Sequence, residues 1–179
     1  MPLNESWLTG EIPGPKKASL IVKPDIADAL IRRAKRPVMI MGHGILEYEV
    51  EGRKLIDCLI ELARKAHIPV VVTASTNKAF LDRKFKPAAV MPAVDIANRL
   101  TDPTWKGIDG REPYDLAIFV GLPYSMEWTI LSGLKHFAPG VKTMTLDCVY
   151  QPNASWSFPN STIKEWAASL KAIVENLED

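Results

Sequence analysis

The chain has 179 residues, of which 47% are hydrophobic and 24% charged, so it is long enough for one domain with a substantial core and too apolar to be disordered. Its 22 lysines and arginines nearly balance its 21 aspartates and glutamates, which leaves a net charge of +1. This balance argues against general nucleic-acid binding, because that function depends on a strong excess of positive charge.

The first residues and the apolar runs indicate a cytoplasmic protein. Residues 1–10 lack the basic and apolar regions of a secretory signal, and no apolar run is long enough to cross a bilayer. We therefore expect no binding to membranes. The cysteines, Cys58 and Cys148, are too few for an iron–sulfur cluster or a cysteine-based zinc site, and the histidines show no metal-binding spacing. We expect no metal in this chain and cysteines that act as small apolar residues in a reducing compartment.

Residues 1–23 are predicted to form an irregular N-terminal arm, and residues 24–179 a single α/β domain. Five proline and glycine residues interrupt any helix in the arm before residue 16, and its apolar residues are too few for a core. The arm could pack back on the domain or lie on a partner. Trp7 suits an anchor in an interface.

Helices and strands are predicted to alternate from residue 24 onward. Pro24 is well placed in the first turn of a helix, and Thr162 with Glu165 matches the capping box at the start of another. The pattern predicts helices over 24–36, 51–66, 92–101, 125–137 and 162–177, and strands over 38–41, 70–72, 116–120 and 141–146. We expect 78–91 and 102–113 to be mostly loop, and Trp156 and Phe158 to lie in a polar loop after the last strand.

The predicted strands are apolar throughout, which is typical of a parallel sheet that helices cover on both faces. Alternation with helices requires crossover connections between parallel strands. The sequence therefore predicts an α/β fold, a three-layer, doubly wound, Rossmann-like parallel sheet.

A ligand site is expected at the carboxyl ends of these strands, where open parallel sheets bind their ligands. The residues that follow the four strands are Gly42, His43 and Gly44, then Thr73, Ala74 and Ser75, then Gly121, Leu122 and Pro123, and last Asp147. Small residues would let a flat or phosphate-bearing ligand approach the backbone, whose amides at the helix starts favour anions. Asp147 is placed to accept hydrogen bonds from a ribose or an adenine edge.

Two features of the first strand end weaken a standard dinucleotide site. The segment 42–47 begins with the Gly-x-Gly of the dinucleotide fingerprint, but Glu47 stands where the third glycine should be. Glu47 and Glu49 would also oppose an anion. A tight turn and a ligand cradle remain alternative roles for the glycines. His43 could move protons, but no nucleophile, base and orienting group accompany it, so we predict no catalytic residue.

Several segments resemble known proteins. Residues 34–44, 62–75, 114–121 and 137–142 resemble the central FAD- or NAD-binding domain of thiamine-diphosphate enzymes of the pyruvate oxidase type. Over nearly its full length the chain resembles the epsilon subunits of the archaeal acetyl-CoA decarbonylase/synthase (carbon monoxide dehydrogenase) complex. That match rests on the N-terminal arm and on residues 36–44, 73–78 and 121–124.

The resemblance implies a non-catalytic, cluster-free accessory subunit. Such a subunit would stabilise the large nickel–iron–sulfur alpha subunit, would assist electron transfer to FAD, and could also associate with itself. The resemblance leaves open whether the crevice holds FAD, NAD or neither. The alternative reading is a free-standing FAD- or NAD-binding protein. A small hydrolase or deacetylase-like enzyme is a weaker third hypothesis, because the chain lacks the required catalytic constellation and zinc module.

Overall fold

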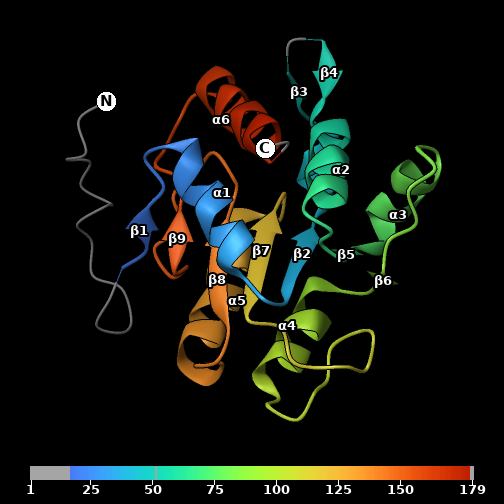
Figure 1. The fold of residues 1–179 in the computed structure, drawn as a ribbon, viewed down its shortest axis with the longest axis vertical. Helices are drawn as coiled ribbons and strands as arrows, with labels where there is room; N and C mark the ends of the chain where they lie inside the picture. The colour runs from blue at the N-terminus through green and yellow to red at the C-terminus, as the bar shows by residue number, and fades with distance from the viewer. Residues whose placement is uncertain (1–16, 51, 178–179) are drawn as a thin grey trace.

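The computed structural model of this protein describes residues 17–50 and 52–177, and at its centre lies a seven-stranded parallel sheet (Figure 1). Its strands are β1 (Ser19–Leu20), β2 (Pro37–Met41), β5 (Val70–Val72), β6 (Ala89–Val90), β7 (Leu116–Val120), β8 (Lys142–Thr145) and β9 (Trp156–Ser157). They lie in the order β1-β9-β8-β7-β2-β5-β6, and every neighbouring pair is parallel. A small antiparallel hairpin, β3 (Glu49–Val50) and β4 (Arg53–Lys54), stands apart from this sheet.

Helices cover both faces of the sheet. They are α1 (Pro24–Arg33), α2 (Leu55–Lys65), α3 (Ala74–Leu81), α4 (Ala93–Thr101), α5 (Tyr124–Phe137) and α6 (Ile163–Asn176), with a 3-10 turn η2 (His43–Leu46) after β2. Met39 and Met41 of β2 pack into the core beneath α1, α2 and α6, whereas Val38 and Ile40 pack into the core beneath α4 and α5. Successive side chains of a strand point to opposite faces, so both faces of β2 are buried. The predicted three-layer α/β fold with a parallel sheet is confirmed.

The chain changes direction across the sheet between β2 and β7. After β2 it continues outward to β5 and β6, then returns to place β7 on the other side of β2. The register pairs Met41 with Val120, so both strands end at the same level. In a doubly wound sheet this reversal opens a crevice at the carboxyl ends of the two strands.

The structure adds a helix and a strand to the region of residues 78–91, which was predicted to be mostly loop. Residues 78–81 belong to helix α3 (Ala74–Leu81), and Ala89–Val90 is a short strand at the sheet edge. Thr76 and Phe80 are the two fully buried residues of α3, at a spacing of four residues. A face of two residues in one short helix leaves little periodicity to detect.

Two other segments that were predicted to be irregular are strands. Ser19–Leu20, from the predicted arm, pairs with Trp156–Ser157, from the predicted polar loop, and together they extend the sheet beyond β8. A strand of two residues is too short to show an apolar run in the sequence, so these strands can be recognised only from their pairing in the structure. The first part of the predicted arm, residues 1–16, lies outside the described residues.

The structure confirms the predicted start of α6 and moves the predicted start of α2. The capping box of α6 is confirmed, because the Thr162 hydroxyl accepts from the Glu165 amide while the Glu165 carboxylate accepts from the Thr162 amide. Helix α2 begins at Leu55 instead of residue 51, because β3 and β4 occupy the preceding segment and Gly52 turns with a φ of 78°.

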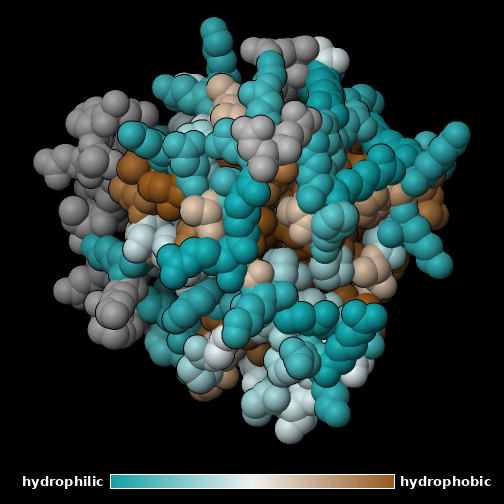
Figure 2. All heavy atoms as spheres, viewed as in Figure 1, coloured by the Kyte–Doolittle hydropathy of each residue, from teal (hydrophilic) through white to brown (hydrophobic). Residues whose placement is uncertain are grey.

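The surface over α1 and α2 is mostly hydrophilic (Figure 2). This polarity matches the exposed basic and acidic side chains expected on the outer faces of both helices. Within residues 17–50 and 52–177, no helix is long and apolar enough to cross a membrane.

Candidate functional site

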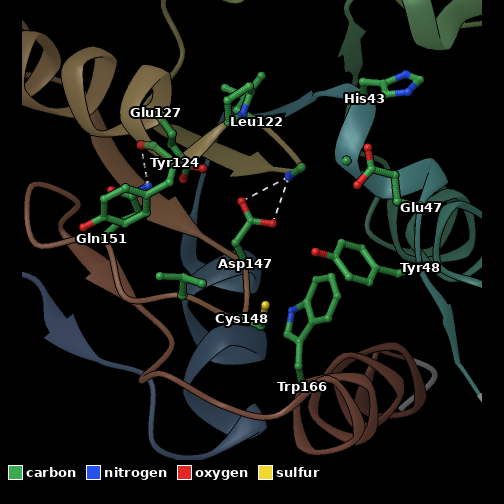
Figure 3. A pocket seen from close by; sticks show the side chains of 14 residues that line it. His43, Glu47, Tyr48, Leu122, Tyr124, Glu127, Asp147, Cys148, Gln151 and Trp166 are labelled. Carbon is green, nitrogen blue, oxygen red and sulfur yellow. Dashed lines mark hydrogen bonds between the residues drawn. The ribbon is translucent and has the colours of Figure 1, made fainter. Parts of the chain in front are cut away.

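A cavity of 360 Å³ lies at the carboxyl ends of β2, β7 and β8, at the crevice beside the reversal of strand order. Figure 3 shows its lining. The lining residues are His43, Gly44, Glu47, Tyr48, Gly121, Leu122, Pro123, Tyr124, Glu127, Asp147, Cys148, Val149, Gln151 and Trp166. Its volume is at the lower end of small-molecule sites, which span about 300–1,000 Å³.

The structure brings six of the ten predicted site residues together. They are His43, Gly44, Gly121, Leu122, Pro123 and Asp147. Gly42 is buried at the end of β2 and does not line the cavity. Thr73, Ala74 and Ser75 also lie outside it, because β5 is separated from β7 by β2. The hydroxyl groups of Thr73 and Ser75 lie 3.3 Å apart, at the start of α3.

The glycines at the ends of β2 and β7 allow close packing of the backbone. A Cβ atom on Gly42 would lie 2.3 Å from the carbonyl oxygen of Gly121, and one on Gly44 would lie 3.0 Å from the same atom. Gly121 itself has a φ of 74°, a conformation that favours glycine. The turn after β2 and the turn after β7 therefore pack backbone against backbone.

The amides at these turns already have acceptors. Gly42 donates to the Val120 carbonyl and Gly44 to the Gly121 carbonyl, both at 2.9 Å. The Gly121 amide donates to both carboxylate oxygens of Asp147, at 2.9 and 3.1 Å (Figure 3). Asp147 thus holds the β7 turn in place, a structural role in addition to its predicted place beside a ligand.

Glu127 is a buried carboxyl group that the sequence analysis did not select. It lies in the first turn of α5 and its side chain is 0% exposed. Burial and the neighbouring Asp147 carboxylate raise the pKa of Glu127 well above its usual range. A signal was available, since Glu127 lies three and seven residues before Ile130 and Leu134, a spacing that places all three on one face of a helix.

Aromatic side chains form the wall next to α6. The rings of Tyr48 and Trp166 meet edge to face, with centroids 5.3 Å apart and planes at 87°. Trp166 is buried, and its indole nitrogen donates to the Leu146 carbonyl at 2.6 Å. Burial raises the pKa of the Cys148 thiol beside them. A thiol with a raised pKa is a weak nucleophile, so Cys148 fits the predicted role of a packing residue.

The geometry around His43 does not provide a catalytic arrangement. Its ring is exposed and points away from Glu47 and Asp147 in Figure 3. Among the described residues no group of three or more histidine, cysteine, aspartate or glutamate side chains could hold a metal ion. The carboxyl groups of Glu47, Glu127 and Asp147 give the cavity several hydrogen-bond acceptors.

Comparison with known proteins places this arrangement in a family. Residues 1–174 match the family model described as CO dehydrogenase beta subunit/acetyl-CoA synthase epsilon subunit. The chain belongs to this family. It is 38% identical over 167 residues to the acetyl-CoA decarbonylase/synthase complex subunit epsilon of Methanothermobacter thermautotrophicus, covering 92% of this chain and 91% of that protein. It is 36% identical over 160 residues to subunit epsilon 1 of Archaeoglobus fulgidus, covering 87% and 83%.

A solved structure shows a weaker likeness. The chain aligns with a thiamine diphosphate-dependent 4-hydroxybenzoylformate decarboxylase of Rhodococcus jostii at 15% identity, with a TM-score of 0.47. The alignment covers 96% of this chain and 30% of that enzyme.

The predicted membership of the epsilon-subunit family is confirmed by the family match and by the archaeal relatives.

The crevice of this epsilon-family chain is a poor fit for the pyrophosphate of FAD or NAD. A pyrophosphate needs free backbone amides, and those of Gly42, Gly44 and Gly121 are already hydrogen-bonded. Glu47, Glu127 and Asp147 place three carboxyl groups along the same cavity. Like charges in a partly buried site disfavour an anion.

The buried carboxyl group predicts how stability depends on pH. The pKa of Glu127 is raised in the folded state, so the folded protein binds more protons than the unfolded chain at pH values above 4.5, the usual glutamate value. The free energy of unfolding therefore falls as pH rises, by at most about 1.4 kcal/mol per pH unit. In Glu127→Gln this contribution is absent.

Urea unfolding of both proteins between pH 5 and pH 8, values chosen to lie above the usual glutamate pKa, is the measurement. We expect the variant to gain stability relative to the natural protein as pH rises. Glu175→Gln, which changes an exposed carboxylate on α6, should follow the natural protein throughout. Parallel profiles for Glu127→Gln and the natural protein would contradict the raised pKa.

Proposed function

We propose that this chain is an accessory subunit that binds and stabilises the large nickel–iron–sulfur alpha subunit of the acetyl-CoA decarbonylase/synthase complex. The names of its relatives describe them as subunits of that complex. A subunit without a catalytic constellation contributes through contacts, so the proposal requires a surface suited to a partner. A groove between α4 and α5 supplies such a surface.

The groove has a volume of 610 Å³, and most of its lining is apolar. Val94, Met126 and Phe137 line it with exposed fractions of 50%, 42% and 72%. Ala97, Ile130 and Leu134 extend the apolar lining between them. Clustered exposed apolar side chains around a hollow are typical of protein–protein contact sites. This exposed apolar groove is the observation that carries the proposal.

Binding of purified alpha subunit to the full-length chain tests the proposal. Burial of a phenylalanine side chain contributes about 1.5–3 kcal/mol, so Phe137→Glu should weaken association at least about tenfold. Leu81→Glu is the matched control, because Leu81 is also an exposed apolar residue at the end of a helix and lies outside the groove. Equal binding by the natural protein and Phe137→Glu would refute this use of the groove.

A second copy of this chain is the alternative occupant of the groove, and the same variant distinguishes it from the alpha subunit. Sedimentation of the isolated chain measures self-association. If Phe137→Glu dissociates a homodimer while binding of the alpha subunit is unchanged, the groove is the self-association surface and the proposed docking face is wrong. Self-association is expected from the family resemblance and stays a prediction.

Assistance of electron transfer to FAD stays a prediction as well. A fluorescence titration of the isolated chain with FAD distinguishes the accessory role from the alternative of a free-standing flavin protein. From the occupied amides and the carboxyl groups of the crevice we expect no saturable binding.

A further inference from the structure

The inner end of the crevice holds hydrogen-bond acceptors that no described residue satisfies. Both carboxyl oxygens of Glu127 and the amide oxygen of Gln151 have no hydrogen-bond partner, although the two side chains are 0% and 1% exposed. The amide nitrogen of Gln151 donates to the Tyr124 carbonyl at 3.2 Å (Figure 3), so the oxygen is the atom of this amide group that lacks a hydrogen-bond partner. A buried acceptor without a donor costs about 1–3 kcal/mol, so such groups need an explanation.

The remaining polar groups of the cavity add negative charge. Asp147 faces the same space, and both of its carboxylate oxygens accept from the Gly121 amide. Glu47 lies on the opposite wall, with its carboxylate turned toward the cavity in Figure 3. Among the described residues, none that lines the cavity is a lysine or an arginine. The site therefore offers acceptors and negative charge in excess of donors and positive charge.

Aromatic rings lie beside these acceptors. Tyr48, Tyr124 and Trp166 all line the cavity, and the face of an aromatic ring attracts a cation within about 6 Å of its centroid. Acidic groups and aromatic rings in one cavity are complementary to organic cations. A bare metal ion is a poorer match, because the described residues include no cluster of three or more metal-ligating side chains.

We propose that this crevice binds a guanidinium or primary ammonium group, held by Glu127, Asp147 and the amide oxygen of Gln151. A guanidinium carries five N–H donors in a plane and pairs with carboxylates through two parallel hydrogen bonds. It would satisfy both unpartnered side chains at once. The group can belong to a free small molecule or to an arginine or lysine side chain of a partner subunit, and the recognition chemistry is the same.

Titration of the isotope-labelled full-length chain with agmatine, which carries both cationic groups, tests the proposal directly. We expect saturable changes in the amide resonance of Gly121, because its hydrogen-bond acceptor Asp147 would pair with the cation. Glu127→Gln keeps the size of the side chain but cannot ionise to pair with a bound cation, so agmatine should bind at least about tenfold more weakly. Glu175→Gln, on the exposed face of α6, should bind agmatine like the natural protein.

A second arm identifies the source of the cation and uses the purified alpha subunit. If agmatine gives no change at Gly121 but Glu127→Gln weakens assembly with the alpha subunit, the group is a side chain of the partner. This arm is independent of the groove, because Phe137→Glu tests the proposed function and leaves the crevice unaltered.

Three outcomes would overturn the proposal. One is the absence of both effects, with Glu127→Gln shown by circular dichroism to be folded. Another is an agmatine response that is equal in Glu127→Gln and the natural protein, which would place binding elsewhere. The third is saturable binding of the anionic ligand FAD that shifts the Gly121 resonance.

Discussion

Replacement of Trp166 with alanine is expected to lower the free energy of unfolding by about 3–5 kcal/mol. Trp166 is among the largest fully buried side chains of the protein. It packs against Tyr48 at the wall of the crevice and donates to the Leu146 carbonyl at the end of β8. The substitution would remove this packing and the hydrogen bond together, and most natural domains have only about 5–15 kcal/mol of stability in total.

Trp166→Phe separates the two contributions. Phenylalanine retains most of the apolar volume and loses the indole N–H, so we expect a loss of about 1–2 kcal/mol. Urea unfolding followed by far-ultraviolet circular dichroism measures all three proteins without using tryptophan fluorescence. A Trp166→Ala variant as stable as Trp166→Phe would show that α6 does not depend on this side chain to pack on the sheet.

Gly42→Ala is expected to destabilise the protein by about 3 kcal/mol, at the upper end of overpacking effects. The new methyl group would lie 2.3 Å from the Gly121 carbonyl oxygen, which is backbone and cannot rotate away. The ends of β2 and β7 would have to separate, and the hydrogen bond from the Gly44 amide to the Gly121 carbonyl would lengthen. The crevice would change shape as a result.

Gly133→Ala is a control for which we expect the opposite change in the free energy of unfolding. Gly133 lies inside α5, and a Cβ atom there would meet no atom within 4 Å. Alanine is favoured over glycine in a helix by about 0.5–1 kcal/mol, so this variant should be more stable than the natural protein. The same unfolding measurement checks both changes. If Gly42→Ala were stabilising too, the close approach of the two turns would be wrong.

The long elements could be predicted because each carries its own signal. The apolar runs at 38–41, 70–72 and 116–120 correspond to β2, β5 and β7 within a residue, and the helix after residue 162 shows both a capping box and an apolar stripe. The two-residue strands β1, β6 and β9 could not be predicted. Their backbones pair with distant segments, and two residues cannot display a period.

The position of the crevice could be predicted from the sequence, but the hydrogen-bonding groups that it leaves free could not. Strand ends at Gly44, Gly121 and Asp147 meet as the rule for parallel sheets requires. The expected anion site assumed that the glycine amides were free. Whether they are free depends on the packing of two turns from different parts of the chain.

The sequence by itself determined a parallel layered α/β architecture with small residues at its strand ends, because apolar runs and helical stripes are local patterns that burial on both faces requires. Only the tertiary structure decided that the glycine amides are satisfied by backbone carbonyls and by Asp147, and that Glu127 from α5 lies next to Asp147. Hydrogen-bond pairing and carboxyl proximity depend on contacts between distant segments. For that reason the sequence led us to expect an anion site, whereas the unpaired acceptors of the crevice led us to propose a cation site.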